Sequence, residues 1–231
     1  MEQEPNEPQK EAPPPLTPLE ARILGCLMEK SIVTPDVYPL TLNALVHACN
    51  QKSNRHPFMQ ATESDVLAAL DELRYVHRLA ILSDTAGSRV PKYRHALGNR
   101  VVLNERLTAL LCELLLRGPQ TVGELRTRAA RLAPMPDLET LENDLEEMAG
   151  GEPPIVVKLP REPGRREARY QHLLCGMPDL TDIARMPEEP ARPTPSAREE
   201  RLAALENAVA DLQSELAALR ESFDLFRQQF E

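Results

Sequence analysis

Residues 51–55 form a short polar segment whose side chains could contact nucleic acid. Amide and hydroxyl groups can bond to base edges or phosphates, and Lys and Arg neutralise phosphates. A second basic set follows about forty residues later. The candidate nucleic-acid-binding residues from these two stretches are Gln51, Lys52, Asn54, Arg55, Arg89, Lys92 and Arg94. The alternative is a solvated loop beside the polar face of a hairpin.

A further basic cluster lies between two short runs of apolar residues near the end of the regularly patterned sequence. It contains Arg161, Arg165, Arg166 and Arg169, with Glu162 and Glu167 interspersed. We add Arg165 and Arg166 to the candidate phosphate contacts. A solvated hairpin tip explains the same residues equally well, because isolated surface charges are common.

Motifs for catalysis or metal binding are missing from the sequence. No GxSxG, Walker A or GxGxxG pattern occurs, so no nucleophile elbow or phosphate-binding glycine loop is expected. The cysteines lack CxxC pairing, which favours buried, reduced thiols over a zinc site. They are Cys26, Cys49, Cys112 and Cys175. We therefore expect no metal, no cofactor and no catalytic residue.

The elements that carry these residues occur twice. The sequence KYRH at residues 92–95 recurs as RYQH at residues 169–172, and each follows three helical patterns and a short β-rich run. Periodicity predicts helices at 18–30, 39–49, 63–77, 104–117, 121–132 and 138–149. It predicts paired strands at 79–82 and 89–97, and at 155–159 and 168–174. Three helices followed by a β-hairpin are typical of a winged-helix domain, so we predict a mainly α, α+β fold with two tandem winged-helix domains.

Capping residues predict where the helices begin, and apolar stripes predict which helix faces point inward. Thr17, Thr62, Asn104 and Asp137 are predicted N-caps. The inward stripes are Val66, Ala69, Leu70 and Leu73 in the third helix, and Leu138, Leu141, Leu145 and Met148 in the sixth. The equivalent strand residues His95 and His172 are expected to point inward, in a packing or hydrogen-bonding role.

The predicted outward faces of the third and sixth helices are acidic. The third helix presents Ser64, Ala68, Asp71, Glu72 and Tyr75, and the sixth presents Glu139, Asn143, Glu146 and Glu147. A helix that reads DNA bases ordinarily presents Arg, Lys, Asn or Gln, whereas carboxylates are repelled by phosphates. We infer that the sixth helix does not enter a DNA groove.

Charge and proline content divide the chain further. The formal net charge is −9, but residues 16–178 carry equal numbers of acidic and basic side chains, so the acidity lies in the two ends. We predict a disordered proline-rich leader (1–15), two winged-helix domains (16–100 and 101–175), a proline-rich linker (176–197) and a C-terminal coiled-coil helix (198–231). No 18-residue apolar run or signal peptide occurs, so we expect a cytoplasmic protein without a membrane span.

The C-terminal segment has an unbroken heptad pattern. Nine apolar residues follow one another at alternating spacings of three and four, which is the seam of a coiled coil. They are Leu202, Leu205, Val209, Leu212, Leu216, Leu219, Phe223, Phe226 and Phe230. This pattern predicts a homodimer, with the opposite charges of Glu215 and Arg220 suiting a parallel pair. Folding of the stripe back onto the body of the same chain is the alternative.

Several long motifs resemble the YceH-like family of uncharacterised bacterial proteins. They are LTPLEARILGCLMEK at 16–30, YPLTLNALVHACNQKSNR at 38–55, SRVPKYRH at 88–95 and PREPGRREARY at 160–170. The likeness covers about residues 16–175, with a terminal coiled coil of the kind seen in the family. The resemblance implies tandem winged-helix domains in a cytosolic bacterial protein, and it implies no assigned activity.

These observations favour binding over catalysis. The leading hypothesis is a DNA-binding protein, acting in transcriptional regulation through the polar segment and the two hairpins. The rival is a protein-interaction scaffold that uses winged-helix domains as docking surfaces. The acidic helix faces favour the rival, and the basic hairpins favour the first. An enzyme is the third hypothesis, with no motif in its support.

Overall fold

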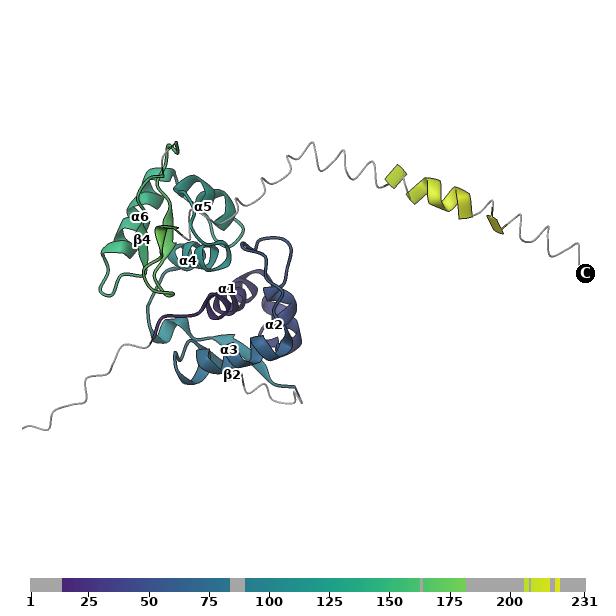
Figure 1. The fold of residues 1–231 in the computed structure, drawn as a ribbon, viewed down its shortest axis with the longest axis horizontal. Coiled ribbons are helices and arrows are strands. Elements are labelled where there is room, and N and C mark those ends of the chain that lie inside the picture. The colour runs from purple at the N-terminus through teal and green to yellow at the C-terminus, as the bar shows by residue number, and fades with distance from the viewer. Residues whose placement is uncertain are drawn as a thin grey trace, which may run out of the picture. The chain divides into compact units, whose positions relative to one another are not determined.

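The computed structural model describes residues 14–83, 90–162, 164–181, 206–207, 209–216 and 219–220. The chain divides into two compact units, residues 1–187 and 188–231. The described part is a mixed α/β structure with small antiparallel sheets (Figure 1). None of its helices has both the length and the apolar character needed to cross a membrane.

The first unit begins with three helices and a three-stranded sheet, which we call the first repeat. Its elements are α1 (Pro18–Val33), η1 (Pro35–Val37), β1 (Leu40–Thr41), α2 (Leu42–Cys49), α3 (Glu63–Tyr75), β2 (Ala80–Ser83) and β3 (Lys92–His95). The sheet is antiparallel with the order β1-β3-β2. Tyr93 of β3 lies opposite both Leu40 and Leu82.

The second repeat has the same order of three helices and a hairpin, with an isolated bridge in place of β1. After η2 (Leu97–Asn99) come α4 (Glu105–Arg117), α5 (Val122–Ala129), α6 (Leu138–Gly150), β4 (Val156–Lys158) and β5 (Tyr170–His172). Tyr170 pairs with Lys158 and forms an isolated bridge with Gln120. His172 lies opposite Val156, as His95 lies opposite Ala80. The repeated sequence motif therefore corresponds to a repeated strand register.

The helices begin where their capping residues predict. The side chains of Thr17, Thr62, Asn104 and Asp137 each accept a hydrogen bond from the first turn of their helix, as predicted. Thr121 caps α5 in the same way. These bonds satisfy backbone N–H groups that have no partner within the helix.

Four helix boundaries differ by two or more residues from the sequence prediction. Helix α1 ends at Val33 rather than near residue 30. Helix α2 starts at Leu42 rather than near residue 39, because Leu40 and Thr41 pair with β3. Helix α3 ends at Tyr75 rather than residue 77, because Arg78 adopts a positive φ of 57° that breaks the helical path. Helix α5 ends at Ala129 rather than residue 132.

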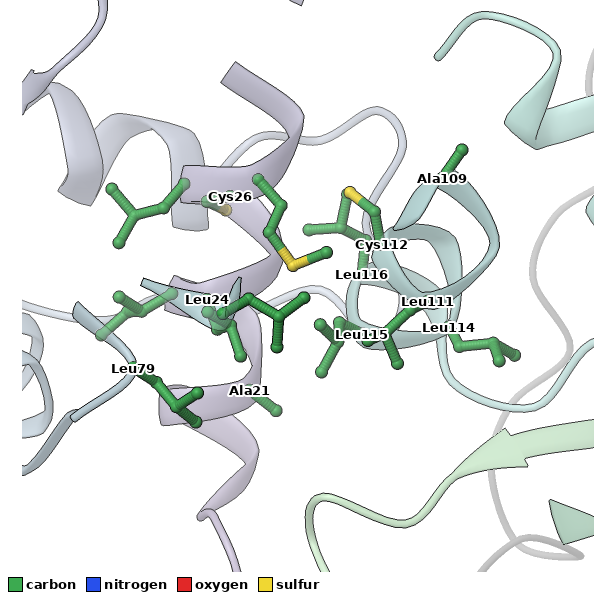
Figure 2. Packing of buried hydrophobic residues seen from close by; sticks show 14 of the residues in the cluster. Ala21, Leu24, Cys26, Leu79, Ala109, Leu111, Cys112, Leu114, Leu115 and Leu116 are labelled. Atoms are coloured by element: carbon green, nitrogen blue, oxygen red, sulfur yellow. The ribbon is translucent and has the colours of Figure 1, made fainter. Parts of the chain in front are cut away.

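Helices α1 and α4 lie side by side at the centre of the first unit (Figure 1). Helices α2 and α3 pack on α1, and α5 and α6 pack on α4. Figure 2 shows the apolar side chains of α1 and α4 filling the space between them. A Cβ atom at Gly25 would lie 3.0 Å from both Leu115 Cβ and Leu116 Cδ2. The glycine therefore permits the close approach of the two helices.

Most of the predicted inward residues form this core. The stripes of α3 and α6 are buried as predicted, with one exception. Leu138 was predicted to point inward, which is wrong: it is 47% exposed at the first position of α6. Cys26, Cys49 and Cys112 are buried free thiols, as predicted.

In the second unit, the described residues 206–207, 209–216 and 219–220 are helical. Their apolar residues Val209, Leu212, Leu216 and Leu219 are exposed. Leu202, Leu205, Phe223, Phe226 and Phe230 of the predicted seam lie outside the described residues.

Candidate functional site

The polar segment 51–55 ends in a buried arginine, whereas Lys52 and Ser53 of the same segment are exposed. Arg55 is only 4% exposed. Its Nε donates to the Ala48 carbonyl at 2.9 Å, and its Nη2 donates to Glu29 Oε2 at 2.5 Å. The assignment of Arg55 as a nucleic-acid-binding residue is therefore wrong, because its guanidinium is buried against a carboxylate and is not accessible to a phosphate.

Arg55 belongs to a set of charged side chains that joins the two repeats. Arg131, after α5, contacts Glu29 and Glu113, each at 2.6 Å. Arg117 of α4 lies 3.1 Å from Glu113. We call Glu29, Arg55, Glu113, Arg117 and Arg131 the buried charge network. Its members come from both repeats, so it ties α1 to α4 and α5.

The side-chain amide of Asn54 and the backbone of His56 also contact α4. Arg117 Nη2 donates to Asn54 Oδ1 at 2.6 Å. The backbone N–H of His56 donates to the Leu116 carbonyl at 2.9 Å. Asn54 adopts a positive φ of 57°, a conformation that asparagine tolerates better than most residues. Asn54 and His56 thus contact the second repeat, whereas the hydrogen bonds of Arg55 are made within the first.

The electrostatics keep this network charged. Burial alone would raise the pKa of Glu29, but its hydrogen bond and ion pair with Arg55, together with Arg131, lower that pKa below its ordinary value. Burial opposes the charge on Arg131 as well, yet Glu113 and Glu29 raise its pKa. At neutral pH, Glu29 and its arginine partners are therefore ionised.

The remaining candidate residues for nucleic-acid binding differ in how far their side chains are exposed. Lys52 and Arg94 are exposed, whereas Gln51 and Lys92 are half-buried. Arg89 lies outside the described residues. In the β4–β5 hairpin, Arg165 and Arg166 are exposed. Glu162 pairs with Arg165 at 3.0 Å and with Arg169 at 3.5 Å, which reduces the net positive charge of this hairpin.

The outward faces of α3 and α6 are acidic, as predicted. On α3 the exposed residues are Glu63, Ser64, Asp65, Leu67, Ala68, Glu72 and Tyr75. On α6 they are Leu138, Glu139, Asn143, Glu146, Glu147 and Gly150. Asp71 is half-buried and pairs with Arg74 at 3.1 Å. Both faces thus combine carboxylates with exposed apolar side chains.

A largely apolar cleft of about 720 Å³ opens beside the C-terminal end of α6, and we call it the α6 groove. Buried side chains form its floor, namely Leu97, Leu107, Met148 and Ile155. The segment between η2 and α4 forms one wall, and residues 173–176 contribute to another. Val102 at the rim is 92% exposed. Sequence analysis missed this groove, although the pair Val101-Val102 in a connecting segment is an available signal.

The repeated histidines serve packing or hydrogen bonding, in line with the prediction. His172 is buried, and burial lowers its pKa to about 4. His95 lies 3.4 Å from Ser31 Oγ, and burial, followed by the nearby Arg94, lowers its pKa. Within the described ranges, no group of three or more His, Cys, Asp or Glu residues is placed to hold a metal ion.

Comparison with known proteins places these features in a bacterial family. Residues 16–165 match the family model described as "Protein of unknown function, DUF480". A UPF0502 protein of Geobacter sulfurreducens is 52% identical over 217 residues, covering 94% of this chain and 98% of the relative. One from Geotalea uraniireducens is 51% identical with the same coverage, and one from Vibrio vulnificus is 49% identical over 89% of this chain and 95% of the relative. The family resemblance inferred from the sequence motifs is confirmed.

Proposed function

Because the chain belongs to the DUF480 family, whose description assigns no activity, we propose a function from the geometry of its surfaces. The protein is a docking scaffold for other proteins, built from two winged-helix repeats. The acidic outward faces of α3 and α6 are its docking surfaces. The C-terminal helix pairs two copies of the chain.

The order of elements supports the winged-helix assignment. Each repeat runs helix, edge pairing, helix, helix and hairpin, and in each the central strand pairs on both sides. In such folds the third helix is the one that reads DNA when DNA is bound. Helices α3 and α6 occupy that position.

The observation that carries the proposal is the charge of those two helices. Glu63, Asp65 and Glu72 are exposed on α3, and Glu139 and Glu147 on α6. Insertion of these faces into a major groove would bring carboxylates toward phosphates, which is unfavourable. A protein surface with complementary positive charge meets no such repulsion.

Burial of Arg55 weakens the second argument for DNA. Arg55 is held by Glu29, and Asn54 accepts a hydrogen bond from Arg117. The exposed cations Arg94, Arg161 and Arg166 support DNA-backbone contact as the second candidate function. These arginines offer contacts to the DNA backbone, which position a protein on the duplex, but the acidic faces of α3 and α6 do not suit base reading.

Homodimerisation is supported by the exposed apolar stripe of the second unit. Val209, Leu212 and Leu216 are each spaced three or four residues from the next, and all are exposed. A lone helix with such a stripe is marginal in water, so a second copy would bury it. In a parallel pair, Glu215 at a g position faces Arg220 at the following e position.

Site-specific photo-crosslinking tests the docking function. Tyr75, at the end of α3, is 69% exposed and is replaced by p-benzoyl-phenylalanine in the full chain, within living bacterial cells. Illumination should give a defined adduct that protease removes and nuclease does not. Val37 of η1, which is 64% exposed and belongs to neither docking surface, is the control position and should give no such adduct. An adduct at position 75 that is sensitive to nuclease would favour DNA binding instead.

A further inference from the structure

The α6 groove has an apolar floor held by several elements. Leu107 comes from α4, Met148 from α6 and Ile155 from the segment before β4. All three are buried at the base of the cleft. Because these side chains belong to the core of the second repeat, the floor is a preformed surface that can receive apolar side chains.

The rim of the groove leaves an apolar side chain unusually exposed. Val102 is 92% exposed, and Pro153 and Pro154 across the groove are exposed as well. Apolar surface at the mouth of an apolar cleft, bordered by charged residues, is typical of an interaction site.

The groove continues the acidic face of α6. Glu139, Asn143 and Glu147 follow one another at intervals of four residues, so they share one face that ends at the groove. Glu147 and Glu152 line the groove, with Arg100 as the cation among its lining residues. Within the described part of the chain, Glu139, Glu147 and Glu152 form no salt bridge within 4 Å, and the cation Arg106 of α4 interacts electrostatically with Glu147. This border favours an occupant of positive charge.

We propose that the α6 groove binds a cationic amphipathic segment of a partner protein. Apolar side chains of that segment occupy the floor, and its Lys or Arg residues lie along Glu147, Glu152 and the acidic face of α6. The inference rests on the proposed docking function and names the chemistry of the partner.

Two other occupants fit the groove less well. A small ligand is oriented by convergent polar groups inside its pocket, whereas the polar side chains that line this groove are those of Arg100, Glu147 and Glu152. The chain's own ends are acidic: residues 1–13 carry four Glu and one Lys, and residues 198–231 carry eight acidic and four basic residues. Pro14 and Pro15 themselves line the groove, but the carboxylates of the rim disfavour an acidic occupant from either end of the chain.

Photo-crosslinking from the rim tests the proposal in the full chain. p-Benzoyl-phenylalanine at position 102 is illuminated in cells, with position 37 as the matched exposed valine. Mass spectrometry then locates the attachment point on the captured partner. We expect a peptide that has more Lys and Arg than Asp and Glu and contains several large apolar residues.

Single charge reversals test the role of the rim. Glu147→Lys should lower the adduct yield at position 102 roughly tenfold, because one attractive contact becomes repulsive. Asp36→Lys reverses an exposed carboxylate on η1 and should leave the yield unchanged. A thermal melt of each variant checks that the fold is intact.

The adducts at positions 102 and 75 test the groove proposal and the docking function separately. No adduct at position 102 beyond that at position 37 overturns the groove, as does attachment to an acidic segment, a lipid, a second copy or residues 1–13. An adduct at position 75 without one at position 102 overturns the groove and leaves the docking function in place. Loss of both adducts overturns both.

Discussion

Replacement of Glu29 by Gln probes the charge network that joins the two repeats. The change keeps the shape of the side chain and removes its charge, so the buried Arg55 and the half-buried Arg131 lose their shared carboxylate. Removal of one partner from a buried ion pair costs about 3–5 kcal/mol, because the other charge stays in a poorly solvated site. The midpoint of thermal unfolding should fall by roughly 6–20 °C, at 2–4 °C per kcal/mol for a unit of this size.

Urea unfolding monitored by circular dichroism measures this effect. Glu72→Gln is the matched control, since Glu72 is exposed on α3, and it should change the free energy of unfolding by less than about 0.5 kcal/mol. A loss below about 1 kcal/mol for Glu29→Gln would refute the reasoning, because that value is typical of a surface pair rather than a buried one.

The dependence of this loss on pH provides a second check. The pKa of Glu29 is lowered by folding, so its contribution to stability is present above the ordinary glutamate pKa and disappears as the pH falls through the folded value. The stability gap between the wild-type chain and Glu29→Gln should therefore be full at pH 7 and should narrow below about pH 4.5. A gap that stays constant down to pH 3 would show that the carboxylate charge is not its source.

Further predictions concern packing and assembly. Gly25→Ala should destabilise the first unit by roughly 1–3 kcal/mol, because its Cβ would lie 3.0 Å from Leu115. Gly150→Ala is the control, because its Cβ would meet no neighbouring atom within 4 Å. This variant should be neutral or stabilising in the same urea assay. Leu70→Ala should cost about 2–5 kcal/mol and Asp71→Ala less than about 0.5 kcal/mol; equal losses would mean that the faces of α3 are wrongly assigned. Light scattering should find a dimer for the full chain and a monomer for residues 1–197 or for Leu212→Glu/Leu216→Glu, and a monomeric full chain would contradict the coiled-coil seam.

Local patterns in the sequence predicted the elements of the first unit well. Capping residues such as Thr62 and Asn104 act on groups within one helical turn, so the start of a helix can be inferred from a few neighbouring residues. The repeated tyrosine and histidine likewise indicated that β3 and β5 occupy equivalent places in their hairpins, and the two strands share the same register. Leu138 was misplaced because the first residue of a helix can satisfy the apolar spacing while pointing to solvent.

The role of residues 51–55 depended on contacts that no local pattern reveals. Glu29 lies 26 residues before Arg55 in the sequence, and Arg131 comes from the other repeat. An arginine in a polar segment has the same appearance in sequence whether it faces phosphate or a buried carboxylate. The α6 groove was missed for a related reason, since Val102, Met148 and Ile155 meet only in the folded unit.

A DNA-binding titration tests the central claim most directly. The full chain is mixed with labelled duplex fragments from the genome that encodes it at 50 mM salt, where phosphate contacts are strongest, and binding is measured by fluorescence anisotropy. The docking account predicts no saturable binding at chain concentrations up to about 1 μM. Saturable binding below that concentration, weakening steeply between 50 and 200 mM salt and lost in Arg94→Ala/Arg166→Ala, would contradict it and establish DNA as the ligand of the two repeats.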